Sequence, residues 1–177
     1  MEEIRTAFSG IALVMSFIAL WVSRHFWLQS NRPIVSAAIE TFVGGSESIA
    51  YNLAVINSGN RPAVGVQLTA DPAEIEKCLM EWTQSFRGSA TTYEGIMRCF
   101  GADGEIPLLL DGKTVTNSFG YTGSTDGTSS FWKYGSSFSV LLTYADLEGR
   151  KYSSKVRLVI KDSASFAGGL WSKGDES

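Results

Sequence analysis

Residues 138–160, FSVLLTYADLEGRKYSSKVRLVI, decide the fold class of this chain. Apolar and polar side chains alternate from Phe138 to Tyr144, and a second run returns from Tyr152 to Ile160. A period of two residues places the apolar side chains on one face of a β-strand. The segment Asp146-Leu147-Glu148-Gly149 between the runs is typical of a turn. We therefore predict a β-hairpin with one face buried in a core.

Shorter alternating or apolar runs upstream predict the remaining strands. They lie at residues 34–42, 49–56, 64–68, 96–100, 106–110 and 115–119. Gly is frequent, with 18 residues, and Pro is rare, with 4, which favours a turn-rich β fold. We predict a mostly β domain over residues 34–161, built as a sandwich of about seven strands.

One helix is predicted as an insertion into this sandwich, over residues 72–84. Asp71 is suited to cap it, Pro72 fits its first turn, and Glu74 is placed to close a capping box. Apolar residues then follow at i, i+3, i+4 and i+7, which is one face of a helix: Ile75, Cys78, Leu79 and Trp82. We expect Glu74, Glu76 and Glu81 to face water.

The N-terminal segment predicts a membrane anchor. The 18 residues from Thr6 to Ser23 carry no charge and would span about 27 Å as a helix. A cleaved signal peptide is the alternative, but the segment before the apolar run holds only Arg5 as a basic residue, and bulky residues follow the run. We predict an uncleaved transmembrane anchor at residues 1–28, a linker at 29–33 and a C-terminal tail at 162–177.

The basic residues that flank the anchor predict its orientation. Arg5 precedes the apolar run, whereas Arg24 and Arg32 follow it and Arg61 lies further on. Because basic flanks stay in the cytoplasm, we expect a single-pass protein of the cell (inner) membrane with a cytoplasmic domain.

A stripe of small residues on the anchor predicts that it packs on another helix. The spacings of 3, 4, 3 and 4 match the seam of a left-handed helix pair, and small residues let helix backbones approach closely in lipid. The partner is a second copy or another membrane subunit, besides the lipid bilayer itself. The stripe consists of Ser9, Ala12, Ser16, Ala19 and Ser23.

The composition of the chain excludes several kinds of site. A net charge of −3 and the absence of a basic cluster argue against nucleic acid as a partner. The chain has one His, His25 beside the anchor, so the domain cannot build a catalytic triad with a histidine base. We expect no catalytic residue, no bound metal and no cofactor. Asp103 and Glu105 are interpreted as a solvated turn.

The two cysteines, Cys78 and Cys99, leave two interpretations open. They form a disulfide if the domain is exported, or they are two buried thiols if it lies in a reducing compartment.

Aromatic residues in polar surroundings are the candidate partner-binding residues of the domain. Residues 112–137 are rich in Gly, Ser and Thr, and rigid aromatics on such a background are typical of binding loops. The alternative is that these rings fold back onto the sandwich as a lid. The candidates are Phe119, Tyr121, Phe131, Trp132 and Tyr134 in this segment, and Phe166, Leu170 and Trp171 in the tail.

Two short motifs carry a family resemblance. Residues 53–59, LAVINSG, followed by Pro62, resemble the strand–turn–strand of Ig-like modules in bacterial cell-envelope proteins. Residues 142–146, LTYAD, with Gly149, are similar to the last hairpin of small bacterial single-pass membrane proteins that carry such a sandwich. The resemblance implies an Ig-like fold and a binding or scaffolding role. We expect an accessory or scaffolding subunit of a membrane protein complex, with a membrane-tethered ligand-sensing domain as the alternative.

Overall fold

The computed structural model describes residues 2–44, 48–80, 91–123 and 130–161. Within these ranges the chain is mostly β, with seven strands in two antiparallel sheets and three α-helices. The chain divides into two compact units, Met1–Arg32 and Pro33–Ser177. The first unit contains one helix, and the second contains every described strand.

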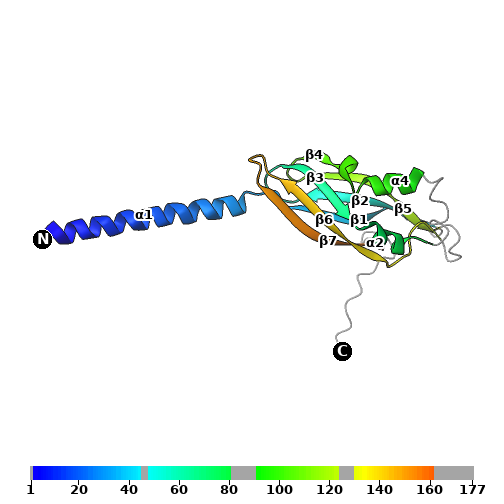
Figure 1. The fold of residues 1–177 in the computed structure, drawn as a ribbon, viewed down its shortest axis with the longest axis horizontal. Coiled ribbons are helices and arrows are strands. Elements are labelled where there is room, and N and C mark those ends of the chain that lie inside the picture. Colours follow the sequence, from blue (N-terminus) through cyan, green and yellow to red (C-terminus); the bar gives the residue numbers. More distant parts are fainter. Residues whose placement is uncertain (1, 45–47, 81–90, 124–129, 162–177) are drawn as a thin grey trace, which may run out of the picture. The chain divides into compact units, whose positions relative to one another are not determined.

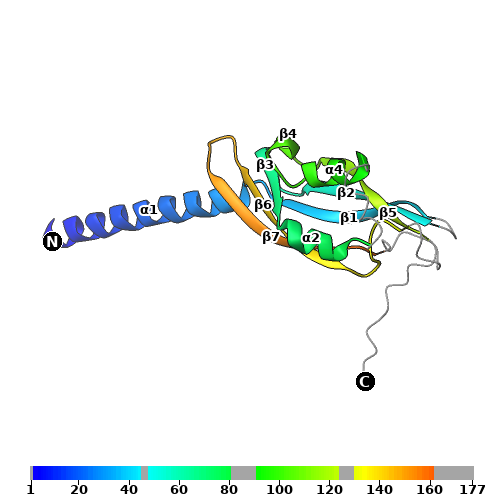
Figure 2. The same ribbon diagram turned by 45° about the vertical axis from the view of Figure 1, so that its right-hand side comes forward.

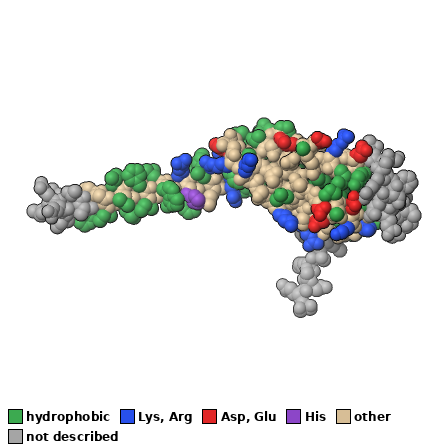
Figure 3. Space-filling model, in the orientation of Figure 1, with side chains coloured by type: hydrophobic (Ala, Val, Ile, Leu, Met, Phe, Trp, Pro, Cys, Tyr) green, Lys and Arg blue, Asp and Glu red, His purple; other side chains and the backbone are tan. Residues whose placement is uncertain are grey.

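Helix α1 (Glu2–Ser30) forms the first unit. Its stretch Phe8–Ser30 has 23 residues and a mean hydropathy of 1.6, which is long and apolar enough to cross a membrane. At 1.5 Å per residue this stretch is about 35 Å long. Its large apolar side chains from Phe8 to Trp27 are exposed, and Figure 3 shows them in green along the helix. The prediction of an N-terminal apolar helix is therefore confirmed.

The second unit has two antiparallel sheets, seen as layers in Figures 1 and 2. The first sheet has the order β1-β2-β5. It contains β1 (Val35–Gly44), β2 (Ser48–Asn57) and β5 (Thr114–Gly123). The second sheet has the order β4-β3-β6-β7. It contains β4 (Ile106–Leu109), β3 (Ala63–Ala70), β6 (Ser137–Ala145) and β7 (Lys151–Val159). The prediction of a mostly β domain with about seven strands is confirmed.

The hairpin predicted from residues 138–160 is formed by β6 and β7. Phe138 pairs with Leu158 and Val140 with Val156, and Phe138, Val140 and Leu158 are buried. The turn is held by Asp146, whose carboxylate accepts bonds from the amides of Glu148 and Arg150 and from the Tyr152 hydroxyl. The alternation of the sequence thus becomes an inner face and an outer face.

Stacked aromatic rings fill the core near the end of β5. Phe119 stacks on Trp132 with 4.9 Å between ring centroids, and Phe100 meets Phe138 edge-on at 5.7 Å. Gly120 has a φ of 78°, and a Cβ there would lie 2.9 Å from the rings of Phe131 and Trp132. Only glycine fits this position, because both the backbone conformation and the ring contact exclude a side chain.

Asn57 ties together the end of the domain at which β1 begins. Its side chain is fully buried, and its amide nitrogen donates to the carbonyl oxygens of Arg61 and Leu109. Its Oδ1 accepts from the amides of Ile34 and Gly59. One buried side chain therefore joins the start of β1, the β2–β3 loop and the end of β4.

The insertion between β3 and β4 differs from the single helix predicted. Its described residues form α2 (Pro72–Cys78), α4 (Thr91–Arg98) and a 3₁₀ turn η1 (Ala102–Gly104). The strand predicted at 96–100 is wrong, because Ile96, Cys99 and Phe100 are buried at helical spacing. A short apolar run does not distinguish a strand from a helix.

Helix α2 begins as predicted but ends earlier. Asp71 caps it by accepting a bond from the amide of Ala73. Glu74 closes no capping box, since its carboxylate accepts the amide of Ser139 on β6. The helix ends at Cys78 because Leu79 is extended and bridges to Trp132. Glu81, Trp82 and the rest of the predicted helix, to residue 84, lie outside the described residues.

Candidate functional site

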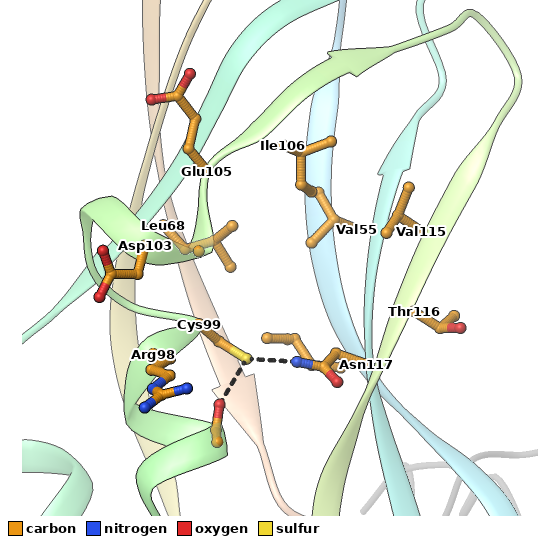
Figure 4. Close-up of a pocket in the computed structure, with 13 residues that line it drawn as sticks. Val55, Leu68, Arg98, Cys99, Asp103, Glu105, Ile106, Val115, Thr116 and Asn117 are labelled. Carbon is orange, nitrogen blue, oxygen red and sulfur yellow. Dashed lines mark hydrogen bonds between the residues drawn. The ribbon is translucent and has the colours of Figure 1, made fainter.

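A cavity of about 440 Å³ opens between the two sheets. On one side of the sandwich β1 packs against β7. The cavity lies on the other side, between β5 and the segment that runs through α4, η1 and β4 (Figure 4). We call this side the open edge. The residues that line the cavity are Leu53, Val55, Leu68, Gly95, Arg98, Cys99, Asp103, Gly104, Glu105, Ile106, Val115, Thr116 and Asn117.

Aliphatic side chains from both sheets form the floor and walls of the cavity. Leu53 and Val55 come from β2 and Leu68 from β3, and all three are buried. Val115 lies opposite Val55 in the β2–β5 ladder, so both side chains point to the same face of the sheet. Val55 is 4% exposed, whereas Val115 is 42% exposed. The inner face of the sandwich is thus open to solvent at β5.

Charged residues lie along one side of the aliphatic floor. In Figure 4 Arg98 on α4 and Asp103 on η1 lie on one side of Cys99, and Val55, Ile106 and Val115 lie on the other. Arg98, Asp103 and Glu105 are exposed. Gly104 allows η1 to lie close against α4. A Cβ at this residue would overlap the Arg98 carbonyl oxygen and lie 2.9 Å from the Cys99 Cα.

Cys99 links α4 to β5 inside the cavity. Asn117 donates a hydrogen bond from Nδ2 to the Cys99 Sγ at 3.0 Å, and the thiol donates to the Gly95 carbonyl oxygen at 3.4 Å (Figure 4). Burial raises the pKa of the Cys99 thiol above its usual 9.0, and the Asn117 bond only partly opposes this shift. The thiol is therefore protonated at neutral pH, which is the unreactive state. Cys78 is also a buried free thiol.

Among the described residues, three of the five aromatics predicted to bind a partner lie in the core. Phe119 and Trp132 are fully buried and Phe131 is 3% exposed. This placement corresponds to the alternative in which the rings fold back onto the sandwich. The strand predicted at residues 115–119 is present and longer, since β5 continues through residues 120–123 of the segment expected as a binding loop. Tyr121 is half-buried and Tyr134 is 60% exposed. Phe166, Leu170 and Trp171 lie outside the described residues.

The predicted small-residue stripe lies along α1. Its members are all exposed, and helical periodicity places them on one face. Ser16 donates its hydroxyl to the Ala12 carbonyl oxygen at 2.8 Å, so this polar group is satisfied within the helix. The stripe consists of Ser9, Ala12, Ser16, Ala19 and Ser23.

The candidate acidic residues that the structure describes are spread out. Asp103 and Glu105 lie at the open edge, whereas Asp111 lies in the turn between β4 and β5. Among the described residues, no three His, Cys, Asp or Glu side chains come close enough to hold a metal ion.

Sequence reasoning missed the open edge. Val115 was expected in a strand, but nothing in the sequence indicates that this strand ends a sheet with its inner face uncovered. Cys99 and Asn117 are 18 residues apart, and only the sheet order brings them together.

No curated protein and no solved structure matches this chain. The model of one family, Domain of unknown function (DUF8453), matches residues 4–164, which include most of α1 and every described strand. The chain therefore belongs to the DUF8453 family.

Proposed function

We propose that this protein is a membrane-anchored interaction module, an accessory or scaffolding subunit of a membrane protein complex. The observation that carries the proposal is the exposed inner face of β5 above a cavity with an aliphatic floor. A concave site with an aliphatic floor and a polar rim is typical of a surface that another molecule covers.

The strand order supports an Ig-like class for the domain. In chain order β1, β2 and β5 correspond to strands A, B and E of an Ig-like sandwich, and β3, β6 and β7 correspond to C, F and G. β4 pairs with β3 as an additional strand on that second sheet. Ig-like modules commonly serve in recognition, but the fold alone assigns no ligand.

Helix α1 supports a single-pass anchor. The stacked pair Trp21 and His25 and the adjacent Phe26 suit the headgroup layer at one end of the apolar stretch. The family match includes both this helix and the domain, which favours a retained anchor over a cleaved leader. The basic residues Arg24 and Arg32 favour a domain in the cytoplasm, at the cell (inner) membrane of a bacterium.

The small-residue stripe of α1 supplies the second contact of the proposed subunit. A face of Ser and Ala allows close packing against a second helix, where van der Waals contact drives association in lipid. The partner is a subunit of the same membrane complex or a second copy of this chain.

A membrane-tethered ligand-sensing domain is the second candidate. A volume of about 440 Å³ lies within the range of small-molecule sites, and a polar rim above an apolar floor is typical of such sites. We propose no catalysis at the open edge, because the Cys99 thiol is protonated and histidine is absent from the domain.

Mild-detergent extraction of the tagged full-length protein, with mass determination and identification of co-purifying chains, tests the first candidate. We expect a stoichiometric companion that Val115→Glu removes and that Leu141→Glu retains. Leu141 is the matched control, because it is 45% exposed on β6 and lies opposite Lys155 on β7.

The joint substitutions Ala12→Leu, Ser16→Leu and Ala19→Leu test the helix stripe in the same assay. Loss of the companion supports the stripe as a packing face. If the native protein and every variant are lone monomers, the result contradicts the subunit proposal and favours the ligand-sensing domain.

A further inference from the structure

We infer that the free edge of β5 binds an extended segment of a partner polypeptide, which adds to the first sheet as a fourth strand. This inference rests on the proposed function and names the kind of partner that the open edge accepts.

The edge strands of the two sheets differ in how they are protected. β7 carries Lys151, Lys155 and Arg157, and it packs against β1 at the closed side of the sandwich. β4 has four residues, and one of them is Pro107, which has no N–H to donate. Charges, prolines and short length are the usual protections against strand addition.

β5 has none of these protections. It is ten residues long, TVTNSFGYTG, and contains no charged residue and no proline. Its first half is rich in β-branched side chains, which favour an extended backbone. β5 pairs with β2 on one side, and among the described strands it is the last of its sheet on the other. An uncharged edge strand of this length presents unpaired backbone groups to a new strand.

The first five residues of β5 are the accessible part of this edge. Residues Thr114–Ser118 are all exposed, and Phe119 and Gly120 are buried. Helix α4 packs against β5, and the bond between Cys99 and Asn117 marks where it approaches. An added strand therefore pairs over about five residues, an ordinary strand length.

The cavity provides the place for the side chains of the added strand. In Figure 4 Val115 and Asn117 point toward the cavity and Thr116 points away from it. Because an added strand continues the same pleat, every second side chain of the partner points to the cavity side. These side chains displace on the order of ten water molecules from an aliphatic floor, which favours binding.

Charge at the mouth of the cavity favours a basic residue in the partner. Asp103 and Glu105 line the cavity together with one cation, Arg98, so the three residues carry a net charge of −1. The partner segment expected here alternates large aliphatic and small polar residues, with Lys or Arg beside them.

A second copy of this chain fits the open edge less well. Two β5 strands paired at their edges would bring one aliphatic side chain, Val115, from each copy toward the cavity of the other. A cavity of about 440 Å³ with a buried floor of Leu53, Val55 and Leu68 accommodates more apolar volume than one valine supplies.

The test uses the full-length protein in detergent and the synthetic peptide Lys-Leu-Thr-Leu-Thr-Leu-Thr-Lys. Binding is measured by fluorescence anisotropy, and hydrogen exchange of the backbone amides is measured with and without the peptide. We expect saturable binding and slower exchange within residues 114–118. A second peptide with N-methyl groups on the central Leu and the Thr that follows it is the control, because neighbouring residues point their N–H groups to opposite edges and one ladder N–H is therefore lost in either strand direction. We expect it to bind at least about tenfold more weakly.

Val115→Glu is the matching protein variant, because it places a charge on the inner face of the edge strand without filling a buried site. We expect peptide binding at least about tenfold weaker for Val115→Glu and unchanged for Leu141→Glu.

Four results overturn the inference. Equal binding of the two peptides shows recognition without strand pairing, and it leaves the proposed function standing. Absence of peptide binding, or protection outside residues 114–118, removes the strand-addition site. Protection of residues 114–118 without peptide, together with a doubled protein mass, assigns the edge to a second copy. The proposed function fails separately, when Val115→Glu retains every companion chain of the full-length protein.

Discussion

Val55 and Val115 are neighbours across β2 and β5 and point to the same side of their sheet, but only Val55 is covered. In a closed sandwich both positions belong to the core, because the opposite sheet lies over them. Here the second sheet ends with β4, and α4 and η1 line the remaining space. The chain has therefore placed one core position of the sandwich at its surface.

Asn57 gives the first prediction on stability. Asn57→Ala leaves the amides of Ile34 and Gly59 and the carbonyls of Arg61 and Leu109 without this partner. We expect a loss of roughly 2 kcal/mol or more in the free energy of unfolding, because buried polar groups without partners are costly. Urea unfolding of the full-length protein measures it. Ser58→Ala is the control, because Ser58 is an exposed residue of the same loop whose hydroxyl makes one exposed bond, and equal losses would contradict the assignment.

Alanine substitutions at Gly120 and Gly112 distinguish the cost of backbone strain from the cost of ring contact. Both have positive φ, 78° and 64°, but only at Gly120 does a Cβ meet other atoms within 4 Å. We expect Gly112→Ala to cost about 1–2 kcal/mol and Gly120→Ala roughly 3 kcal/mol or more, since the latter adds a clash with Phe131 and Trp132. Thermal unfolding and near-UV circular dichroism report the difference. Similar losses for the two variants would show that the rings move aside.

Asp146 predicts a fall in stability at low pH. Burial alone would raise the pKa of its carboxyl, but hydrogen bonds from the Arg150 amide, the Tyr152 hydroxyl and the Glu148 amide lower the pKa below the usual 3.8. The charged form therefore stabilises the fold above the unfolded pKa, and this contribution is lost as the pH falls through the lowered folded value. Urea unfolding at a series of pH values measures it.

The variant Asp146→Asn removes this part of the pH dependence. We expect its stability relative to the native protein to be lowest near neutral pH and to converge with it in acid. Asp111→Asn, at an exposed turn residue, is the control, and a native pH profile for Asp146→Asn would contradict the assignment.

Tyr152 predicts a second fall, at high pH. Burial and the neighbouring Asp146 carboxylate raise the pKa of its hydroxyl above 10.0. The neutral hydroxyl donates to Asp146, so its contribution is complete below the unfolded pKa and is lost as the pH rises through the raised folded value. Tyr152→Phe is expected to flatten the stability profile above pH 10. An unchanged profile would exclude this role.

Cys99 predicts slow chemical labelling. Cys99 is 8% exposed and burial raises the pKa of its thiol, so little thiolate is present at neutral pH. In a Cys78→Ser background, we expect iodoacetamide to label Cys99 at least about 100-fold faster in urea than in the folded state. Asn117→Ala is expected to accelerate labelling of the folded protein, because it removes the contact that holds α4 to β5 at this point. Rapid labelling of the folded parent would contradict the buried thiol.

Alternating residues made most of the fold predictable. The pairing of Phe138 with Leu158 and the burial of Tyr51 and Leu53 follow from a period of two, since a strand has one inner face. The apolar helix α1 and the cap at Asp71 were also predictable from the sequence, because length and capping chemistry are local properties.

The open edge was not predictable, because it depends on which strands end each sheet. β5 is the fifth strand in the chain but pairs with the second, and this order leaves Val115 uncovered. The burial of Phe131 and Trp132 was difficult to predict for a related reason. Their surroundings in sequence are polar, and only the pairing of Leu79 with Trp132 reveals that they enter the core.

The ladder between β1 and β2 has a mechanical consequence. β1 is the strand through which the chain enters the domain, and it pairs with β2 from Val35 opposite Asn57 to Gly44 opposite Ile49. Tension applied at Val35 along the strand axis loads these hydrogen bonds together, as shear, instead of opening them one at a time. Forced unfolding is governed by the rate at which the structure breaks, and a ladder in shear breaks slowly. The first sheet is thus suited to bear a pull at its N-terminal strand, and the edge proposed for strand addition, β5, lies at the opposite side of the same sheet.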